Sequence, residues 1–250
     1  MRPRPARTVR ALALICALGP LASAALAADE AQRATERARM LERIERHARD
    51  ATAALGREHV DPRVLAVMGS LPREEFVPED QRPYAYDDRP LPIGYGQTIS
   101  QPFIVALMTD MLQVGPDDVV LEVGTGSGYQ AAVLSRLVGE VHTIEIIPEL
   151  AARAAEALSG QGLDHVRTYI GDGYYGVEDA APFDAIIVTA AASHVPPPLV
   201  AQLEPGGRMV IPVGGAFALQ HLMLIEKDEG GQVRSRQTLP VAFVPLTRGS

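Results

Sequence analysis

The stretch VVLEVGTGSGYQAAVL at residues 119–134 decides the fold. Its first five residues are apolar apart from Glu122, which is expected for a strand that is buried on both faces. Three glycines follow at alternate positions from 124 to 128, and a helical pattern then runs from about Tyr129 to Val138. Glycine is needed where the backbone turns sharply and a ligand must come close. A strand, a glycine loop and a helix in this order predict a ligand site at the carboxyl end of the strand.

The chain downstream of this stretch alternates between strands and helices. Apolar runs predict further strands at residues 141–146, 166–170, 183–188 and 209–213, with helices at 148–158 and 198–203. This alternation is typical of an α/β fold with a mostly parallel, doubly wound sheet. Two extended runs at 219–227 and 232–244, joined by Asp228-Glu229-Gly230-Gly231, predict a C-terminal antiparallel hairpin.

The chain upstream of the stretch is less regular. Asp61-Pro62 predicts the start of a short helix, with Asp61 as its N-cap. Residues 72–102 are rich in proline, glycine and aromatic residues and predict a long functional loop, followed by a helix over 104–112. Residues 28–57 predict an exposed, charged helical leader with modest core contact, and the domain that carries the function is expected at 58–250.

The first 27 residues are typical of a secretory signal peptide. Four arginines lie within the first ten residues, an apolar run follows at 11–18, and Ala25-Leu26-Ala27 matches a cleavage site. The alternative is a membrane anchor, but Gly19-Pro20 interrupts the run, which is short for a membrane span. We therefore expect no stable membrane anchor and a periplasmic or secreted protein. Internal initiation at Met40 would instead give a cytoplasmic one.

Composition narrows the function classes. Cys16 is the single cysteine and lies within the expected signal peptide, so the mature chain has no disulfide, thiol nucleophile or cysteine metal site. No histidine pair has metal-ligand spacing, and we predict no metal. Removal of the four arginines takes the net charge from −8 to −12, which disfavours nucleic acid as a partner.

The glycine loop is the centre of a predicted cofactor site. Its spacing is G-x-G-x-G rather than the G-x-G-x-x-G of a dinucleotide fingerprint, and S-adenosylmethionine carries no pyrophosphate. Glu145 ends the next strand, where a carboxylate can accept from both ribose hydroxyls, although a solvated strand end would look the same. Asp172 and Gly173 follow the third strand, where an adenine amino group can be met. The predicted cofactor contacts are Glu122, which faces the ammonium group, together with Gly124, Thr125, Gly126, Gly128, Glu145, Asp172 and Gly173.

Several segments from about residue 58 to the end resemble protein-L-isoaspartate O-methyltransferases. The most specific is GQTISQP at 96–102, because glycine-loop methyltransferases of other kinds lack it. The others are EEFVP at 74–78, AYDDRPLPIG at 85–94, LEVGTGSGYQAAVL at 121–134, GDGYYG at 171–176, FDAIIVTAAA at 183–192, LEPGGRMVIPVG at 203–214 and FVPL at 243–246. The signal peptide and the charged helix depart from the family pattern.

The resemblance implies a Rossmann-like, S-adenosylmethionine-dependent methyltransferase fold and an enzyme that repairs damaged proteins. Its substrates would be proteins and peptides that contain isoaspartate, methylated on the free carboxylate and then returned through a succinimide. By the same resemblance, Ser100 is the active-site serine, and Gln97 and Thr98 flank it in the substrate site. Alternatively, Ser100 caps the helix that begins after Pro102. The protein is expected to be monomeric.

The expected chemistry needs no general base, because a carboxylate near neutral pH is already ionised. Placement of the two reacting groups then does the work of catalysis. Two other functions remain open at this point. One is a methyltransferase with the same cofactor fold that acts on a small molecule. The other is a non-catalytic module that binds isoaspartyl or extended peptides outside the cytoplasm, where the source of the cofactor is unexplained.

Overall fold

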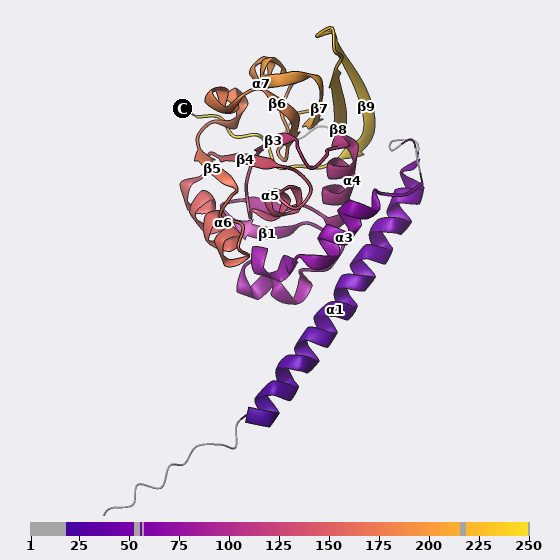
Figure 1. Cartoon of the computed structure of the whole chain (residues 1–250), viewed down its shortest axis with the longest axis vertical. Helices are drawn as coiled ribbons and strands as arrows, with labels where there is room; N and C mark the ends of the chain where they lie inside the picture. Colours follow the sequence, from indigo (N-terminus) through magenta and orange to yellow (C-terminus); the bar gives the residue numbers. More distant parts are fainter. Residues whose placement is uncertain (1–18, 53–55, 57, 216–218, 250) are drawn as a thin grey trace, which may run out of the picture. The chain divides into compact units, whose positions relative to one another are not determined.

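The computed structural model describes residues 19–52, 56, 58–215 and 219–249 (Figure 1). The chain divides into two compact units, Met1–Glu36 and Arg37–Ser250, and helix α1 (Gly19–Asp50) crosses the boundary between them. In the first unit, Arg33 pairs with Asp29 one helical turn away. The expected signal peptide lies outside the described residues as far as position 18. Among the helices that are described, none is both long and apolar enough to cross a membrane.

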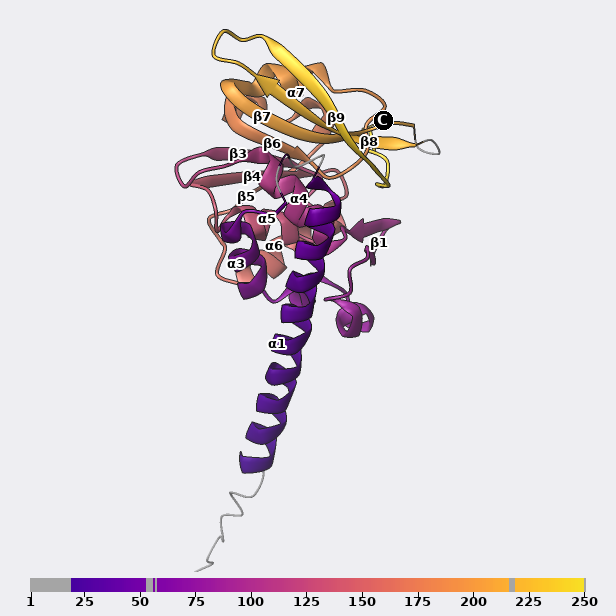
Figure 2. The same cartoon turned by 90° about the vertical axis from the view of Figure 1, so that its right-hand side faces the viewer.

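The second unit is built on one seven-stranded sheet in the order β5-β4-β3-β6-β7-β8-β9 (Figures 1 and 2). The strands from β5 to β7 pair in parallel, whereas β8 and β9 pair antiparallel and close one edge. The predicted α/β fold, with a mostly parallel sheet and a C-terminal hairpin, is therefore confirmed. The strands are β3 (Val119–Val123), β4 (Glu140–Glu145), β5 (Arg167–Ile170), β6 (Phe183–Val188), β7 (Leu203–Val213), β8 (Gln220–Lys227) and β9 (Val233–Val241).

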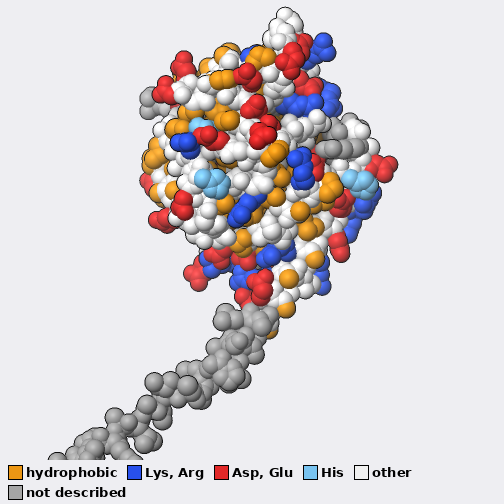
Figure 3. Space-filling view, viewed as in Figure 1, with side chains coloured by type: hydrophobic (Ala, Val, Ile, Leu, Met, Phe, Trp, Pro, Cys, Tyr) orange, Lys and Arg blue, Asp and Glu red, His pale blue; other side chains and the backbone are white. Residues whose placement is uncertain are grey.

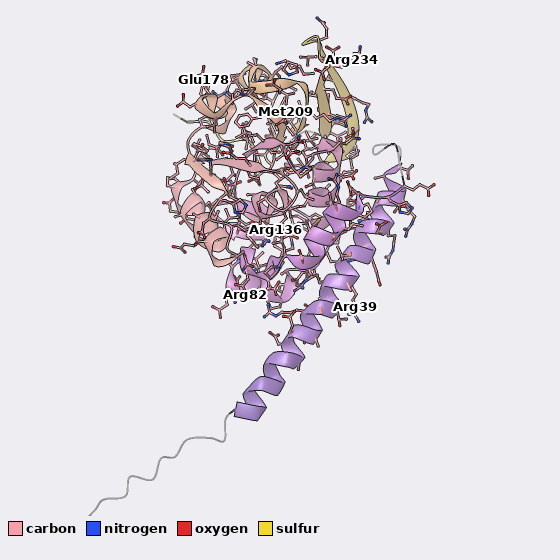
Figure 4. All side chains as sticks on the ribbon, in the orientation of Figure 1. Arg39, Arg82, Arg136, Glu178, Met209 and Arg234 are labelled. Atoms are coloured by element: carbon pink, nitrogen blue, oxygen red, sulfur yellow. The ribbon has the colours of Figure 1, made fainter. Side chains whose placement is uncertain are left out.

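Helices cover both faces of this sheet because its central strands are apolar on both sides. In β3, Val120 packs into the core beneath one face, while Leu121 and Val123 pack into the core beneath the other. Met209, labelled in Figure 4, is fully buried in the second core. Figure 2 shows the two layers of helices on opposite sides of the sheet. The first layer contains α3 (Pro62–Ser70), α4 (Pro102–Leu112), α5 (Tyr129–Leu134) and α6 (Pro148–Gly160), and the second contains α7 (Pro197–Gln202) with the 3₁₀ turns η3 (Gly173–Tyr175) and η4 (Glu178–Ala180).

The predicted long loop at 72–102 contains short elements that the sequence pattern conceals. Two 3₁₀ turns, η1 (Arg73–Phe76) and η2 (Glu79–Tyr84), precede a small antiparallel hairpin of β1 (Leu91–Gly94) and β2 (Gln97–Ile99). Tyr95 at the tip of the hairpin has φ 54°, between two glycines that also have positive φ. Non-glycine residues rarely adopt this conformation. Alternation of apolar and polar residues along the sequence therefore does not reveal a hairpin with such a tip.

Two element boundaries also differ from the sequence prediction. Helix α5 ends at Leu134 instead of Val138, and the Ser135 hydroxyl donates to the carbonyl of Ala132. Local bonds of this kind compete with continuation of a helix. Strand β7 begins at Leu203 instead of Met209, because the segment before Met209 is extended and Leu203 pairs with Phe183 ahead of a register shift. The predicted N-cap at Asp61 is confirmed, since its carboxylate accepts from the backbone N–H of Arg63.

The second half of α1 contributes more to the core than the predicted modest contact. Met40, Ile44 and Ala48 recur every fourth residue, are fully buried and belong to the larger core. Arg43 Nη2 donates to the carbonyl of Tyr86 at 2.7 Å. The helical spacing of Ile44 and Ala48 indicated this face, but the charged composition of 28–57 led to the prediction of only modest core contact. The compact unit therefore begins at Arg37, within the segment that the sequence assigned to a leader.

Burial of this stripe makes α1 part of the folded unit, and truncation of Ile44 tests that role. We expect Ile44→Ala to lower the free energy of unfolding by about 2–5 kcal/mol, the usual cost of removing a large aliphatic side chain from a core. Arg46→Ala, at an exposed position on the same helix, should change it by less than about 0.5 kcal/mol. Urea unfolding of the full chain measures both. Equal, small effects would show that α1 is not part of the core.

Candidate functional site

The main cavity lies where the carboxyl ends of β3, β4 and β6 meet. Its volume is about 750 Å³, a figure that includes the open mouth. It is lined by residues of the glycine loop, by residues 97–100 of the long loop at 72–102, here called the substrate loop, and by the C-terminal segment 244–247. The predicted site residues that line it are Gln97, Thr98, Ser100, Glu122, Gly124, Gly126, Glu145 and Gly173. Thr125, Gly128 and Asp172 are not among the lining residues.

The glycine loop is shaped by close backbone approaches. Gly124 has φ 95°, and a Cβ there would stand 2.5 Å from Thr189 Oγ1, whose hydroxyl donates to the Gly124 carbonyl at 2.6 Å. Gly128 also has positive φ, but its Cβ would meet Ala154 on α6 and not the cavity. The Thr125 hydroxyl is buried against that of Thr143. Gly128 and Thr125 therefore hold the loop in place, whereas Gly124 and Gly126 face the cavity.

Glu145 joins this loop to the next strand. One carboxylate oxygen accepts from Gly126 N at 2.8 Å, and the other accepts from Ile146 N and Ile147 N, both at 3.0 Å. A carboxylate offers about four acceptor positions, so about one remains for a ligand. The sequence predicted that Glu145 accepts hydrogen bonds from both ribose hydroxyls. The structure places it at the cavity as expected, but with most of its capacity used by the backbone.

Glu122 is fully buried in β3 and lines the cavity. Its Oε2 accepts from the Thr143 hydroxyl at 2.5 Å, while its Oε1 has no hydrogen-bond partner in the described part of the chain. Burial raises the pKa of Glu122 to about 8; the Thr143 hydrogen bond acts against this shift, and the charge of Glu145 adds to it. The hydroxyl of Tyr129, also in the cavity wall, is buried without a partner. Unpartnered buried polar atoms need an explanation. A ligand with a cationic group fits Glu122 Oε1, whereas the Tyr129 ring already lies against the cationic guanidinium of Arg73.

The raised pKa of Glu122 predicts the direction in which the stability of the protein changes with pH. A carboxyl that holds its proton more tightly when folded favours folding below its unfolded pKa, and that advantage is lost as the pH rises from about 4.5 to about 8. Without cofactor, the stability of the wild type relative to Glu122→Gln should therefore fall by about 1.4 kcal/mol per pH unit across this window. Urea unfolding of both proteins at several pH values measures this slope. A stability difference that does not change with pH would contradict the buried, neutral carboxyl.

Asp172 differs from its predicted role at the adenine. Its carboxylate accepts from Tyr174 N, Arg248 Nε and Gly249 N, each at 3.0 Å, and the Arg248 guanidinium stacks over the ring of Tyr174. Burial acts to raise the pKa of Asp172, but the hydrogen bonds from Arg248, Tyr174 and Gly249 hold it below its usual range. The carboxylate is therefore committed to the C-terminal tail. Its neighbour Gly173 does line the cavity, close against Val123.

Ser100 stands between two cavities. It lines the main cavity and also a second one of about 960 Å³, including open space, and both cavities share Thr98, Thr189 and Val244. The Ser100 hydroxyl makes no hydrogen bond to another described residue. The predicted alternative role, capping of α4, is not found, since Gln101 is the N-cap and makes no side-chain cap bond. Ser100, with its free hydroxyl, is therefore part of the wall that the two cavities share.

Two polar side chains that the sequence analysis did not single out hold the loop around Ser100. Asp88 accepts from Phe103 N at 3.2 Å and from Gln101 Nε2 at 2.9 Å, and so caps α4 from a distant loop. Arg73 Nη2 donates to the Ser100 carbonyl at 2.6 Å. Thr189 was missed as well, although it follows β6 at the binding edge of the sheet and a strand-end rule would have found it.

The histidines hold no metal site. His142 is buried in β4 and stacks on Tyr169, and burial lowers its pKa. His194 lies in a loop against Tyr174 and Ser193. Across the described ranges, no cluster of three or more His, Cys, Asp or Glu side chains is placed to hold a metal ion. Carboxylates, hydroxyls and backbone groups line the cavity.

Comparisons with known proteins agree with this geometry. The family model for protein-L-isoaspartate(D-aspartate) O-methyltransferase matches residues 52–250. Protein-L-isoaspartate O-methyltransferase 2 of Syntrophobacter fumaroxidans is 56% identical over 97% of this chain and 98% of its own length. Protein-L-isoaspartate O-methyltransferase 1 of Cupriavidus necator is 58% identical over 94% of this chain and 88% of its own length. A Plasmodium falciparum protein, provisionally described as an enzyme of this kind and solved with S-adenosyl-L-homocysteine, is 25% identical with a TM-score of 0.69, over 84% of this chain and 97% of its own.

Proposed function

Because the chain belongs to the protein-L-isoaspartate O-methyltransferase family, we propose that Ser100 orients the isoaspartyl carboxylate at the wall between the two cavities. The enzyme transfers a methyl group from S-adenosylmethionine to the free carboxylate of L-isoaspartyl residues, and the ester then leads to repair through a succinimide. The free Ser100 hydroxyl, placed where the cavities meet, is the observation that carries the proposal.

The glycine-loop cavity fits the cofactor. Gly124 and Gly126 allow a close approach, and Glu145 keeps about one acceptor position for a ribose hydroxyl. Glu122 offers an unpartnered carboxyl oxygen to a cationic group. When bound, S-adenosylmethionine supplies a methyl group on a positively charged sulfur, to which a carboxylate oxygen bonds as the methyl–sulfur bond breaks. Gln97 and Thr98, from β2 of the substrate loop, line the same cavity beside Ser100.

Placement is then the main contribution of the protein. The attacking oxygen belongs to the substrate and is ionised near neutral pH. Ser100 contributes a hydroxyl donor that fixes its direction. The proposal therefore needs no paired acid and base among the protein's side chains.

Selectivity for isoaspartate separates this proposal from a small-molecule methyltransferase. We expect methyl transfer to an isoaspartyl peptide and little to the aspartyl peptide of the same sequence. Ser100→Ala should lower turnover by roughly 100-fold, the cost of a placement error of about 1 Å, with unchanged affinity for S-adenosylhomocysteine. Ser159→Ala, the same change at an exposed position on α6 outside the cavity, serves as the control and should retain turnover.

The proposal fails if the aspartyl and isoaspartyl peptides are labelled equally. A non-catalytic peptide-binding module would give no labelling of either peptide, and calorimetry with S-adenosylhomocysteine would then show whether the cofactor cavity binds at all.

The proposed partners are damaged proteins and peptides. On the face shown in Figure 3, acidic and basic side chains are interspersed, and Figure 4 shows Arg234 at the outer strand β9.

We propose that the enzyme acts as a monomer, because the unit Arg37–Ser250 itself contains all the residues named at the site.

We also propose that residues 1–27 direct export and are removed after Ala27. The basic start, the apolar run and the cleavage pattern support this. A start at Met40 would remove Arg37, whose Nε donates to the Tyr86 hydroxyl at 3.2 Å, and would begin the chain within the buried stripe of α1.

Sequencing of the N-terminus of the native protein tests export. We expect the chain to begin at Ala28 and to be recovered from the periplasmic or secreted fraction. A chain that begins at Met40 and fractionates with the cytoplasm would contradict the proposal. An uncleaved N-terminus held in the membrane fraction would favour the anchor alternative.

A further inference from the structure

Arg73 is a fully buried cation that contacts the loop carrying Ser100. It lies in η1 and is one of the largest completely buried side chains in the described part of the chain. Its Nε donates to the carbonyl of Ala85 at 2.8 Å, and its Nη2 donates to the carbonyl of Ser100 at 2.6 Å. No carboxylate forms an ion pair with it in the described ranges of the chain. A buried charge without a counter-ion is costly, so its presence needs a reason beyond packing.

The guanidinium of Arg73 also contacts Tyr129, a residue of the cavity wall. Nη1 has no hydrogen-bond partner among the described residues, and neither does the hydroxyl of Tyr129. The guanidinium stands 4.7 Å from the centre of the Tyr129 ring. Tyr129 begins α5, directly after the glycine loop, and lines the main cavity. One side chain therefore contacts both the loop that carries Ser100 and the helix that follows the cofactor loop.

We propose that Arg73 is a positioning residue for methyl transfer, which fixes the backbone of Ser100 relative to the cofactor loop. A guanidinium is a planar fork with donors in fixed directions, so it can hold two carbonyls and an aromatic face at one geometry. The ammonium of lysine is a flexible point charge and cannot do this. Arg73 touches neither substrate nor cofactor in this arrangement, and it acts through Ser100. The inference therefore rests on the role proposed for Ser100.

The electrostatics of the surroundings agree with this role. Burial lowers the pKa of Arg73, while Tyr129 and nearby acidic groups act to raise it, and a guanidinium stays charged in proteins. The carboxylate of Glu145 in the cavity wall would repel a substrate carboxylate. Arg73 places a positive charge against the Ser100 carbonyl, and that charge has the sign that attracts such a group.

A double-mutant cycle tests the inference. The variants are Arg73→Lys, Ser100→Ala and the two combined, and kcat is measured with an isoaspartyl peptide per S-adenosylhomocysteine-binding site, which removes any unfolded fraction. We expect Arg73→Lys to lower kcat by roughly 10- to 100-fold with cofactor affinity within about twofold of wild type. In the Ser100→Ala protein the same change should cost less than about threefold, because the hydroxyl that it positions is gone.

Arg43→Lys is the matched control. Arg43 also donates to a backbone carbonyl, that of Tyr86, and has one buried unpartnered nitrogen, but Tyr86 does not line the main cavity. Its kcat should stay within about twofold of wild type. Arg73→Met, which removes both donors without leaving a buried charge, provides a second variant and should show the same loss as Arg73→Lys.

The outcomes separate the two proposals. If Ser100→Ala retains full turnover, the role proposed for Ser100 fails and the inference falls with it. If Ser100→Ala loses turnover but Arg73→Lys and Arg73→Met do not, the inference alone is wrong. Equal losses from Arg73→Lys in both backgrounds, or a parallel loss of cofactor affinity, would likewise overturn it, because either result indicates general damage to the fold.

Discussion

The site depends on the carboxylate of Glu145, which joins the glycine loop after β3 to the turn after β4. It accepts from three backbone N–H groups, one in the glycine loop after β3 and two in the turn after β4. Hydrogen bonds to an ionised acceptor are among the strongest in proteins, and these are largely shielded from water. The loop therefore has a defined shape before any ligand arrives. The same side chain also faces the cavity, so a single carboxylate gives both rigidity and an acceptor.

Around this fixed loop, the charges are arranged on opposite walls. Glu122 and Glu145 lie on the strand side, where a cationic cofactor fits, and Arg73 lies behind the substrate loop, where an anionic carboxylate fits. Each of the three side chains is buried, and burial of a polar or charged group is costly unless a partner is supplied. The unpartnered oxygen of Glu122 is therefore consistent with a cavity that is completed by its ligand, whereas Arg73 is not among the residues that line the cavity and is held by two backbone carbonyls.

The sheet and its binding edge could be predicted because their signals are local. The apolar runs of β3 and β6 have the predicted bounds, and the glycine spacing placed Gly124, Gly126 and Glu145 at the cavity. The contributions of Arg73 and Asp88 could not be predicted, because each depends on how the irregular segment that begins at residue 72 folds back on itself, and no local pattern records this. Asp172 fitted the strand-end rule but is occupied by Arg248, some 76 residues further along the chain. The apolar face of α1 could be recognised from its spacing, but the charges on either side of it led to an underestimate of its burial.

The central claim is that the enzyme places a carboxylate that needs no general base, and rate against pH tests it most directly. Wild type and Ser100→Ala are compared on one isoaspartyl peptide across the pH range. The account predicts the same acid limb in both, near pH 4 for an unperturbed substrate carboxylate, with Ser100→Ala slower throughout. A limb near neutral pH that is present in the wild type and absent in Ser100→Ala would contradict the account, because it would make Ser100 part of a proton-transfer network.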